Sequence, residues 1–139
     1  MLLTIEKVAI LKSADIFATT PDYVLASVAA IAEEVDVEAN ETFINEGEVE
    51  DSMYVIIDGE VRMHGGDKTM MTFSEGQVVG EMEVLAPAPR AMSVTAVSDT
   101  HLFRIHKDAF DEVMADRPEI AQGVIQVLVN RLRANMVNS

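Results

Sequence analysis

Residues 78–96, "VVGEMEVLAPAPRAMSVTA", place a single arginine, Arg90, among small apolar residues. Two strand-like runs flank a short segment, Glu81 to Leu85, that can form one or two helical turns. A helix start presents unpaired N–H groups that suit a small anion, and Arg90 can add a fork of donors to the same anion. Glu81 can accept hydrogen bonds from neutral hydroxyls. Together these groups describe a pocket for a sugar phosphate. The alternative is a plain loop with a surface ion pair.

This stretch lies within a longer segment, residues 35–106, of short β-branched and apolar runs separated by turn signals. The "DG" at residues 58–59 and the "GGD" at residues 65–67 stand where tight hairpins are expected. Strands this short and evenly spaced favour a small barrel, roll or sandwich over a parallel sheet with crossover helices. We therefore expect a mainly β fold, an antiparallel and jelly-roll-like β-roll.

Helical patterns flank the β segment on both sides. Residues 1–34 are expected to hold N-terminal helices, and residues 107–139 are expected to hold C-terminal helices. The C-terminal segment carries an apolar stripe at four-residue steps, formed by Ile120, Val124, Leu128, Leu132 and Met136. Because no linker or internal repeat interrupts the chain, we expect one domain spanning residues 1–139.

The charge balance limits the partners of the chain. Its 139 residues include 24 acidic and 10 basic side chains, for a net charge of −14, and no cysteine. Such a chain repels nucleic acid and anionic membranes, and no basic patch offsets the repulsion. No apolar run approaches the roughly 20 residues of a membrane span. We expect a cytoplasmic protein with no direct nucleic-acid partner and no membrane insertion.

Other chemistries have little support in the sequence. His101 and His106 are poorly spaced as a ligand pair, so no metal site is expected and a barrel metalloenzyme is disfavoured. No serine stands in a nucleophile-elbow sequence. The acidic run "NEGEVED", residues 45–51, lacks the spacing of a calcium loop and is interpreted as a solvated loop. The sequence does not predict an enzyme.

The sequence resembles the cyclic nucleotide-binding domain family, which includes protein kinase regulatory subunits and catabolite-activator-type regulators. "LKSADIF" (11–17) resembles an N-terminal helix of the family, and "ETFINEGEVEDSMYVIIDGEVRM" (41–63) resembles its first β half, with Gly47 and Gly59. "FSEGQVVGEM" (73–82) and "PRAMSVTA" (89–96) resemble the phosphate-binding cassette, here residues 80–91. The resemblance covers almost the whole chain and implies a regulatory, non-enzymatic module.

The resemblance also implies roles for individual residues. Glu81, after Gly80, would bind the ribose 2′-hydroxyl, and Arg90 would hold the exocyclic phosphate oxygens. Backbone amides around Met82, Glu83 and Ala91 would contact the phosphate. Ala91, where members favouring cGMP often have Thr or Ser, favours cAMP over cGMP as the regulatory ligand. No other cofactor is expected.

Two residues depart from the family pattern. Glu83 stands where a small residue is usual, and a carboxylate close to a phosphate costs roughly 3 kcal/mol at an effective dielectric near 20. This carboxylate would swing to solvent or pair with Arg90 and fill the site itself. Met92, also near the cassette, replaces a smaller residue and would narrow the pocket. The alternative function is therefore a degenerate domain that binds no ligand and serves as an interaction or dimerisation module.

The C-terminal helix would complete the regulatory function. In many family members a residue of this helix covers the base, and here only aliphatic residues could do so: Val124, Ile125, Leu128 or Leu132. Ligand capture would move the helix and pass the change to an effector. The same stripe could instead form a homodimer seam or dock on a neighbouring domain.

Overall fold

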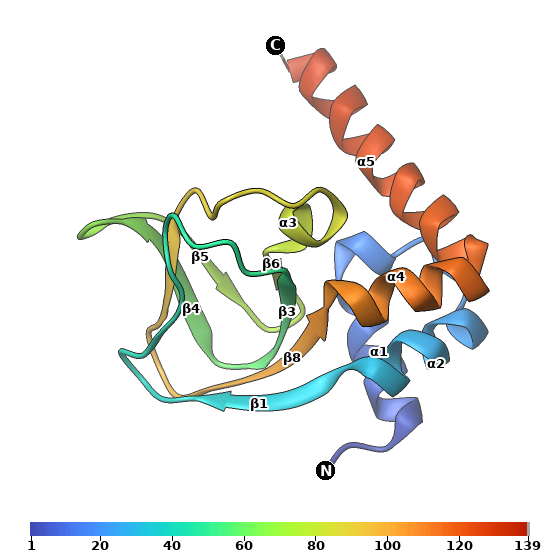
Figure 1. Ribbon diagram of the computed structural model, residues 1–139, viewed down its shortest axis with the longest axis horizontal. Coiled ribbons are helices and arrows are strands. Elements are labelled where there is room, and N and C mark those ends of the chain that lie inside the picture. Colours follow the sequence, from blue (N-terminus) through green and yellow to red (C-terminus); the bar gives the residue numbers. More distant parts are fainter. Residues whose placement is uncertain (139) are drawn as a thin grey trace. The chain divides into compact units, whose positions relative to one another are not determined.

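The structure is a computed structural model that describes residues 1–138. Two compact units make up the chain. One unit comprises residues 32–108, and the other comprises residues 1–31 with the segment from residue 109 onward. The first unit contains the strands and the second contains most of the helices (Figure 1).

Within residues 32–108 eight strands pair antiparallel in two four-stranded sheets, with strand orders β1-β8-β3-β6 and β2-β7-β4-β5. The strands are β1 (Glu33–Val37), β2 (Thr42–Ile44), β3 (Ser52–Asp58), β4 (Glu60–Gly65), β5 (Lys68–Ser74), β6 (Val78–Val79), β7 (Ser93–Ala96) and β8 (Thr100–His106). The predicted antiparallel β-roll is confirmed. The first strand begins at Glu33, inside the segment expected to be helical.

The core of the β unit lies among side chains of both sheets. Strand β3 is buried almost throughout, which explains its nearly continuous apolar sequence, "SMYVIID". Strand β5 lies at the edge of its sheet and is largely exposed. The buried core cluster consists of Val37, Ile44, Tyr54, Ile56, Val61, Val79, Val94, Ala96 and Leu102.

The two expected hairpins have different outcomes. The "GGD" turn joins β4 to β5, which pair antiparallel, so this hairpin is confirmed. The prediction for "DG" is wrong, because β3 and β4 belong to different sheets. Asp58 and Gly59 instead carry the chain from one sheet to the other. Periodicity and turn residues mark the reversal but do not reveal which strands pair.

The helical unit is built around an aromatic pair. Phe17 and Phe110 are fully buried and meet edge to face, with ring centroids 6.1 Å apart. Thr19 donates a 2.8 Å hydrogen bond to the carbonyl of Gly123, which ties the N-terminal segment to the last helix. The helices are α1 (Thr4–Ser13), the 3-10 turn η1 (Asp15–Phe17), α2 (Asp22–Ile31), α4 (Lys107–Asp116) and α5 (Pro118–Asn138). The first two residues of α4 belong to the β unit.

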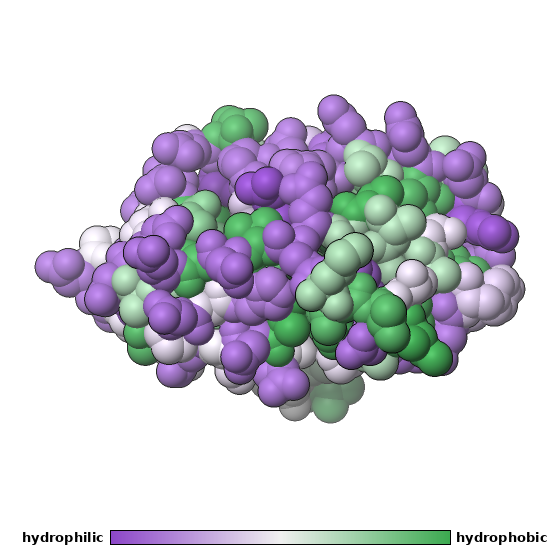
Figure 2. Space-filling view, turned by 90° about the horizontal axis from the view of Figure 1, so that it is seen from below, coloured by the Kyte–Doolittle hydropathy of each residue, from purple (hydrophilic) through white to green (hydrophobic). Residues whose placement is uncertain are grey.

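The surface combines charged and apolar regions. Hydrophilic side chains cover much of the face in Figure 2, while hydrophobic ones gather toward its right-hand side. None of the helices within residues 1–138 is both long and apolar enough to cross a membrane.

Candidate ligand-binding site

A pocket of about 410 Å³ opens in the β unit. Its lining brings together all seven residues that the sequence assigned to the site: Gly80, Glu81, Met82, Glu83, Arg90, Ala91 and Met92. The remaining lining residues are apolar and come from five strands: Ile44, Met63, Met71, Phe73, Val78, Val79 and Val94. Pockets that bind small molecules have volumes of roughly 300–1,000 Å³, so the space suits one such ligand.

A short helix forms one side of the pocket. The predicted segment is confirmed as α3 (Glu81–Leu85). It is preceded by Gly80, whose φ of +83° lies in the left-handed region. A Cβ atom at Gly80 would lie 2.5 Å from Nη1 of Arg90 and 3.0 Å from the carbonyl oxygen of Ser52. Glycine therefore permits both the turn into α3 and the close approach of the arginine.

The backbone of Arg90 is fixed on both sides of its Cα atom. Its N–H donates to the carbonyl of Glu48 at 2.9 Å, and its own carbonyl accepts from the N–H of Gly47 at 2.8 Å. These bonds hold the loop after α3 against the segment between β2 and β3. The residue is only 3% exposed. Arg90 is therefore a positioned group of the pocket and not a solvated surface charge.

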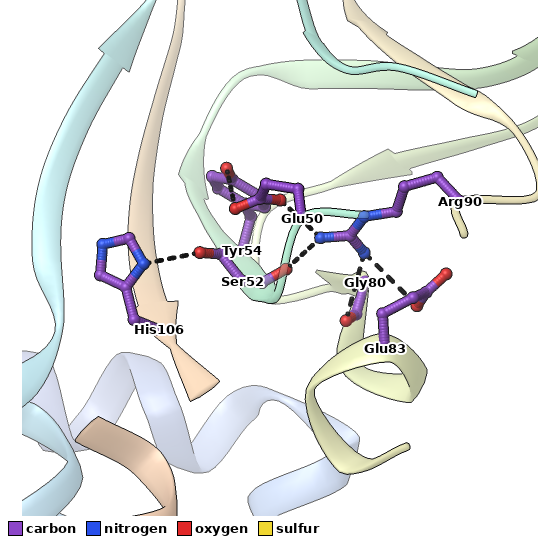
Figure 3. Close-up of polar contacts among 7 residues, drawn as sticks. All are labelled: Glu50, Ser52, Tyr54, Gly80, Glu83, Arg90 and His106. Atoms are coloured by element: carbon purple, nitrogen blue, oxygen red, sulfur yellow. Dashed lines mark hydrogen bonds and ion pairs between the residues drawn. The ribbon is translucent and has the colours of Figure 1, made fainter. Parts of the chain in front are cut away.

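The guanidinium of Arg90 lies between two carboxylates (Figure 3). Its Nη2 donates to Oε2 of Glu50 at 2.6 Å and to the carbonyl of Ser52 at 2.5 Å. Its Nη1 lies 3.3 Å from Oε2 of Glu83 and 3.5 Å from the carbonyl of Gly80. Within residues 1–138, the buried Nε has no hydrogen-bond partner.

These distances settle how Glu83 behaves in this structure. The carboxylate does not swing to solvent but forms an ion pair with Arg90, one of the two arrangements expected from the sequence. One guanidinium and two carboxylates leave the cluster with a net negative charge. An incoming phosphate therefore meets a site whose cation is already neutralised by the chain's own acidic residues.

Glu50 is the site residue that sequence reasoning missed. It lies 40 positions before Arg90, in the acidic run for which the sequence predicts a solvated loop. Its second oxygen accepts a 3.5 Å hydrogen bond from the hydroxyl of Tyr54. Burial, followed by the charge of Glu50, raises the pKa of Tyr54, so the phenol remains a neutral donor. No local spacing signal could have paired residues so distant in sequence.

Two side-chain bonds link the site to the junction between β8 and α4. The hydroxyl of Ser52, whose carbonyl binds Arg90, lies 2.8 Å from Nδ1 of His106, the last residue of β8 (Figure 3). Nζ of Lys107, the first residue of α4, donates to the carbonyl of Val84 in α3 at 3.0 Å. The short helix beside the pocket is thus bonded directly to the start of α4.

The histidines serve hydrogen bonding and ion pairing. Both ring nitrogens of His101 meet carboxylates, with Nδ1 2.5 Å from Asp36 and Nε2 3.0 Å from Glu34. His64 is buried and bonds to the carbonyl of Gly66 and the hydroxyl of Thr95. Among the described residues, no cluster of three His, Cys, Asp or Glu side chains could hold a metal ion.

The residues considered for covering a base differ in exposure along α5. Val124 is buried, Leu128 is half-buried, and Ile125 and Leu132 are exposed. Their assignment to a base, a dimer seam or a docking face stays a prediction.

Comparison with known proteins places this geometry in a family. The family model described as "Cyclic nucleotide-binding domain" matches residues 34–117. The CRP-like cAMP-activated global transcriptional regulator of Mycobacterium tuberculosis is 30% identical over 129 residues. This alignment covers 89% of the chain and 58% of the regulator, so the chain spans little more than half of that relative.

Solved structures agree with the sequence match. The N-terminal domain of a transcriptional regulator from Streptomyces coelicolor A3(2) has a TM-score of 0.84 and 25% identity, covering 93% of this chain and 94% of that one. The regulatory domain of Toxoplasma gondii PKA with cAMP has a TM-score of 0.72 and 27% identity, covering 78% and 44%. Since the family model also spans more than half of the residues, this chain belongs to the cyclic nucleotide-binding domain family.

Proposed function

We propose that the chain is a regulatory module that binds a cyclic nucleotide in the pocket between α3 and the sheet β2-β7-β4-β5. The observation that carries this proposal is Arg90, which is buried in the pocket wall and keeps one N–H donor, at Nε, without a partner among residues 1–138. A buried donor left unpaired costs about 1–3 kcal/mol, which a phosphate oxygen would recover. The phosphate binds Arg90, and Glu81 accepts a hydrogen bond from the ribose hydroxyl.

Binding requires an exchange of anions at Arg90. Glu83 lines the pocket and its carboxylate is 3.3 Å from the guanidinium, whereas Glu50 lies outside the pocket lining at 2.6 Å. The longer ion pair inside the pocket is the one that a phosphate displaces. Glu50 stays in place as the permanent counterion of a buried cation. Ala91 supplies no hydroxyl for a guanine, which supports cAMP as the favoured ligand by a modest margin.

The proposed regulatory output runs through the start of α4. Displacing Glu83 shifts α3, and α3 is bonded to Lys107 through the carbonyl of Val84. A ligand that favours one position of α3 therefore favours one position of the β8–α4 junction. In this proposal residues 1–139 act as one domain, whose C-terminal helices pass the change to an effector. The similarity to a cAMP-activated transcriptional regulator supports such a role.

Isothermal titration of cAMP and cGMP into the purified chain tests the proposal. We expect micromolar or tighter binding that is lost in Arg90→Gln, with circular dichroism confirming that the variant is folded. Absence of both heat and thermal stabilisation at millimolar ligand would contradict the proposal.

A second candidate function is an interaction module with a disabled pocket. The specific observation in its favour is that both terminal nitrogens of Arg90 are already bonded within the chain, to Glu50, Glu83 and two carbonyls. The variant Glu83→Ala separates the candidates. If the wild-type chain binds no nucleotide and this variant does, Glu83 alone blocks the pocket. If neither binds, the fold serves protein contacts.

A further inference from the structure

The pocket floor is a row of four apolar side chains, one from each strand of the sheet β2-β7-β4-β5. The strand register places Ile44 beside Val94, Val94 beside Met63, and Met63 beside Met71. All four residues line the pocket. Since neighbouring strands lie about 4.8 Å apart, the row extends roughly 14 Å across the sheet. Ile44 and Val94 are almost fully buried, at 3% and 2% exposure, whereas Met63 is half-buried and Met71 is 56% exposed, so the row is an apolar wall whose accessible side chains are the two methionines.

The polar side chains of the pocket come from one short stretch of the chain. Among the lining residues only Glu81, Glu83 and Arg90 carry charged or hydrogen-bonding side chains, and all three come from the segment around α3. A nucleotide anchored there by its phosphate and ribose must place its base on the apolar remainder. The lining side chains beneath that base cannot donate or accept hydrogen bonds at its edge.

Methionine is the commonest residue in this lining. Met63, Met71, Met82 and Met92 account for four of its fourteen members. Methionine side chains are unbranched and polarisable, so they adapt to rings of different outline and make favourable sulfur–aromatic contacts. Flexible surfaces rich in methionine are a recurrent feature of binding sites that accept several partners.

From this arrangement we infer that the site is tolerant of the base: it takes 3′,5′-cyclic nucleotides as a class, selected by phosphate and ribose. This inference rests on the proposed function and names its ligand class. A pocket built to hydrogen-bond a substrate group rejects analogues that lack it by roughly 10⁴-fold or more, whereas an apolar pocket separates similar ligands by only about 10 to 200-fold. Purines cover more of the row than pyrimidines do and therefore bind somewhat more tightly.

Titration of cyclic AMP, GMP, CMP and UMP into the same chain measures the tolerance. We expect the dissociation constants of the two purine nucleotides to lie within about tenfold of each other, and those of all four nucleotides within about a hundredfold. Dissociation constants that differ more widely than this would overturn base tolerance and leave the proposed function intact. If none of the four binds either wild type or Glu83→Ala, the proposed function fails and this inference fails with it.

A pair of variants on strand β5 locates the base. Met70 and Met71 are adjacent and similarly exposed, at 53% and 56%, but only Met71 lines the pocket. Met71→Gln introduces an amide beneath the base and is expected to change the relative affinities of the four nucleotides by severalfold. Met70→Gln, the matched control, is expected to leave each within about twofold. Unchanged ratios in Met71→Gln would show that the base does not lie on this row and would overturn the inference.

Discussion

Oε2 of Glu83 lies 3.3 Å from Nη1 of Arg90, in the wall of the pocket where the phosphate of a cyclic nucleotide is proposed to bind. The carboxylate is an internal anion that competes with any external one. Because it is tethered to α3, its effective concentration at the arginine does not depend on the solution. The affinity of the site for a nucleotide consequently depends on how much more strongly Arg90 binds the phosphate than it binds the Glu83 carboxylate.

The substitution Glu83→Gln is expected to strengthen nucleotide binding about tenfold. The amide removes the charge that competes with the phosphate. Because the wild-type carboxylate can move partly into solvent when it is displaced, the gain in binding free energy is smaller than the roughly 3 kcal/mol of repulsion between a fixed carboxylate and a phosphate. Isothermal titration with cAMP measures the change. Glu75→Gln removes an equal charge from an exposed turn outside the pocket lining and serves as the control. Weaker binding by Glu83→Gln would mean that Glu83 helps to hold the ligand.

Glu50 is expected to matter more for stability than Glu83 does. It makes the shorter bond to a side chain that is buried, so Glu50→Ala leaves the guanidinium without its main counterion. We expect a loss of about 2 kcal/mol in the free energy of unfolding, and about 1 kcal/mol for Glu83→Ala. Urea denaturation of the two variants gives the comparison. The reverse order would show that Glu83 is the structural counterion.

Substitutions at two glycines distinguish the stability cost of a left-handed backbone from the cost of steric crowding. Gly47 and Gly80 have almost the same φ, +86° and +83°, but within the described part of the chain a Cβ at Gly47 meets no atom within 4 Å, whereas one at Gly80 meets Arg90. Gly47→Ala is expected to cost about 1 kcal/mol from the left-handed conformation alone. Gly80→Ala adds the cost of overpacking, roughly 1–3 kcal/mol more. Equal losses in urea denaturation would contradict the close packing of Arg90 on Gly80.

His101 makes stability depend on pH. Partial burial lowers its pKa, but hydrogen bonds to Glu34 and Asp36 and their charges outweigh burial, so the pKa is raised above 6.5. Only the protonated ring can donate to both carboxylates. A raised pKa contributes stability that is fully present below the unfolded pKa of about 6.5 and is lost as pH rises through the folded value.

The free energies of unfolding of wild type and His101→Gln, measured between about pH 5.5 and 8.5, test this contribution. We expect the wild-type advantage to be largest at the acidic end and to shrink as the pH rises. High salt should reduce it, because the pairs are partly exposed. A difference that grows toward alkaline pH would contradict the assignment.

The sequence predicts the parts of the molecule that depend on local patterns. Short apolar runs and turn residues indicate the β-roll, and the segment from Gly80 to Arg90 indicates the pocket wall, because both signals lie within a few residues of one another. Strand pairing is harder to predict from the sequence, as the turn at Asp58 and Gly59 shows. That turn joins strands of different sheets, and nothing in its two residues distinguishes it from a hairpin.

The contacts that decide affinity are the least predictable. Glu50 meets Arg90 across 40 positions, from an acidic run in which residues 45–49 are exposed. The apolar row beneath the proposed base combines single residues from four strands, so it exists only once their register is known. Alternation in "EVRMH" and "TMMTF" places Met63 and Met71 on one face of each strand but does not show that the two faces coincide.

The two backbone bonds that hold residue 90 bear on how this pocket could be redesigned. They run between main-chain atoms of residues 47, 48 and 90, so most replacements of Arg90 would retain them; proline, which lacks the N–H, would not. The loop would then keep its path while the chemistry of its side chain changes. Substitution of residue 90 could therefore place a different anion-binding side chain, or a reporter group, in the wall of the same cavity.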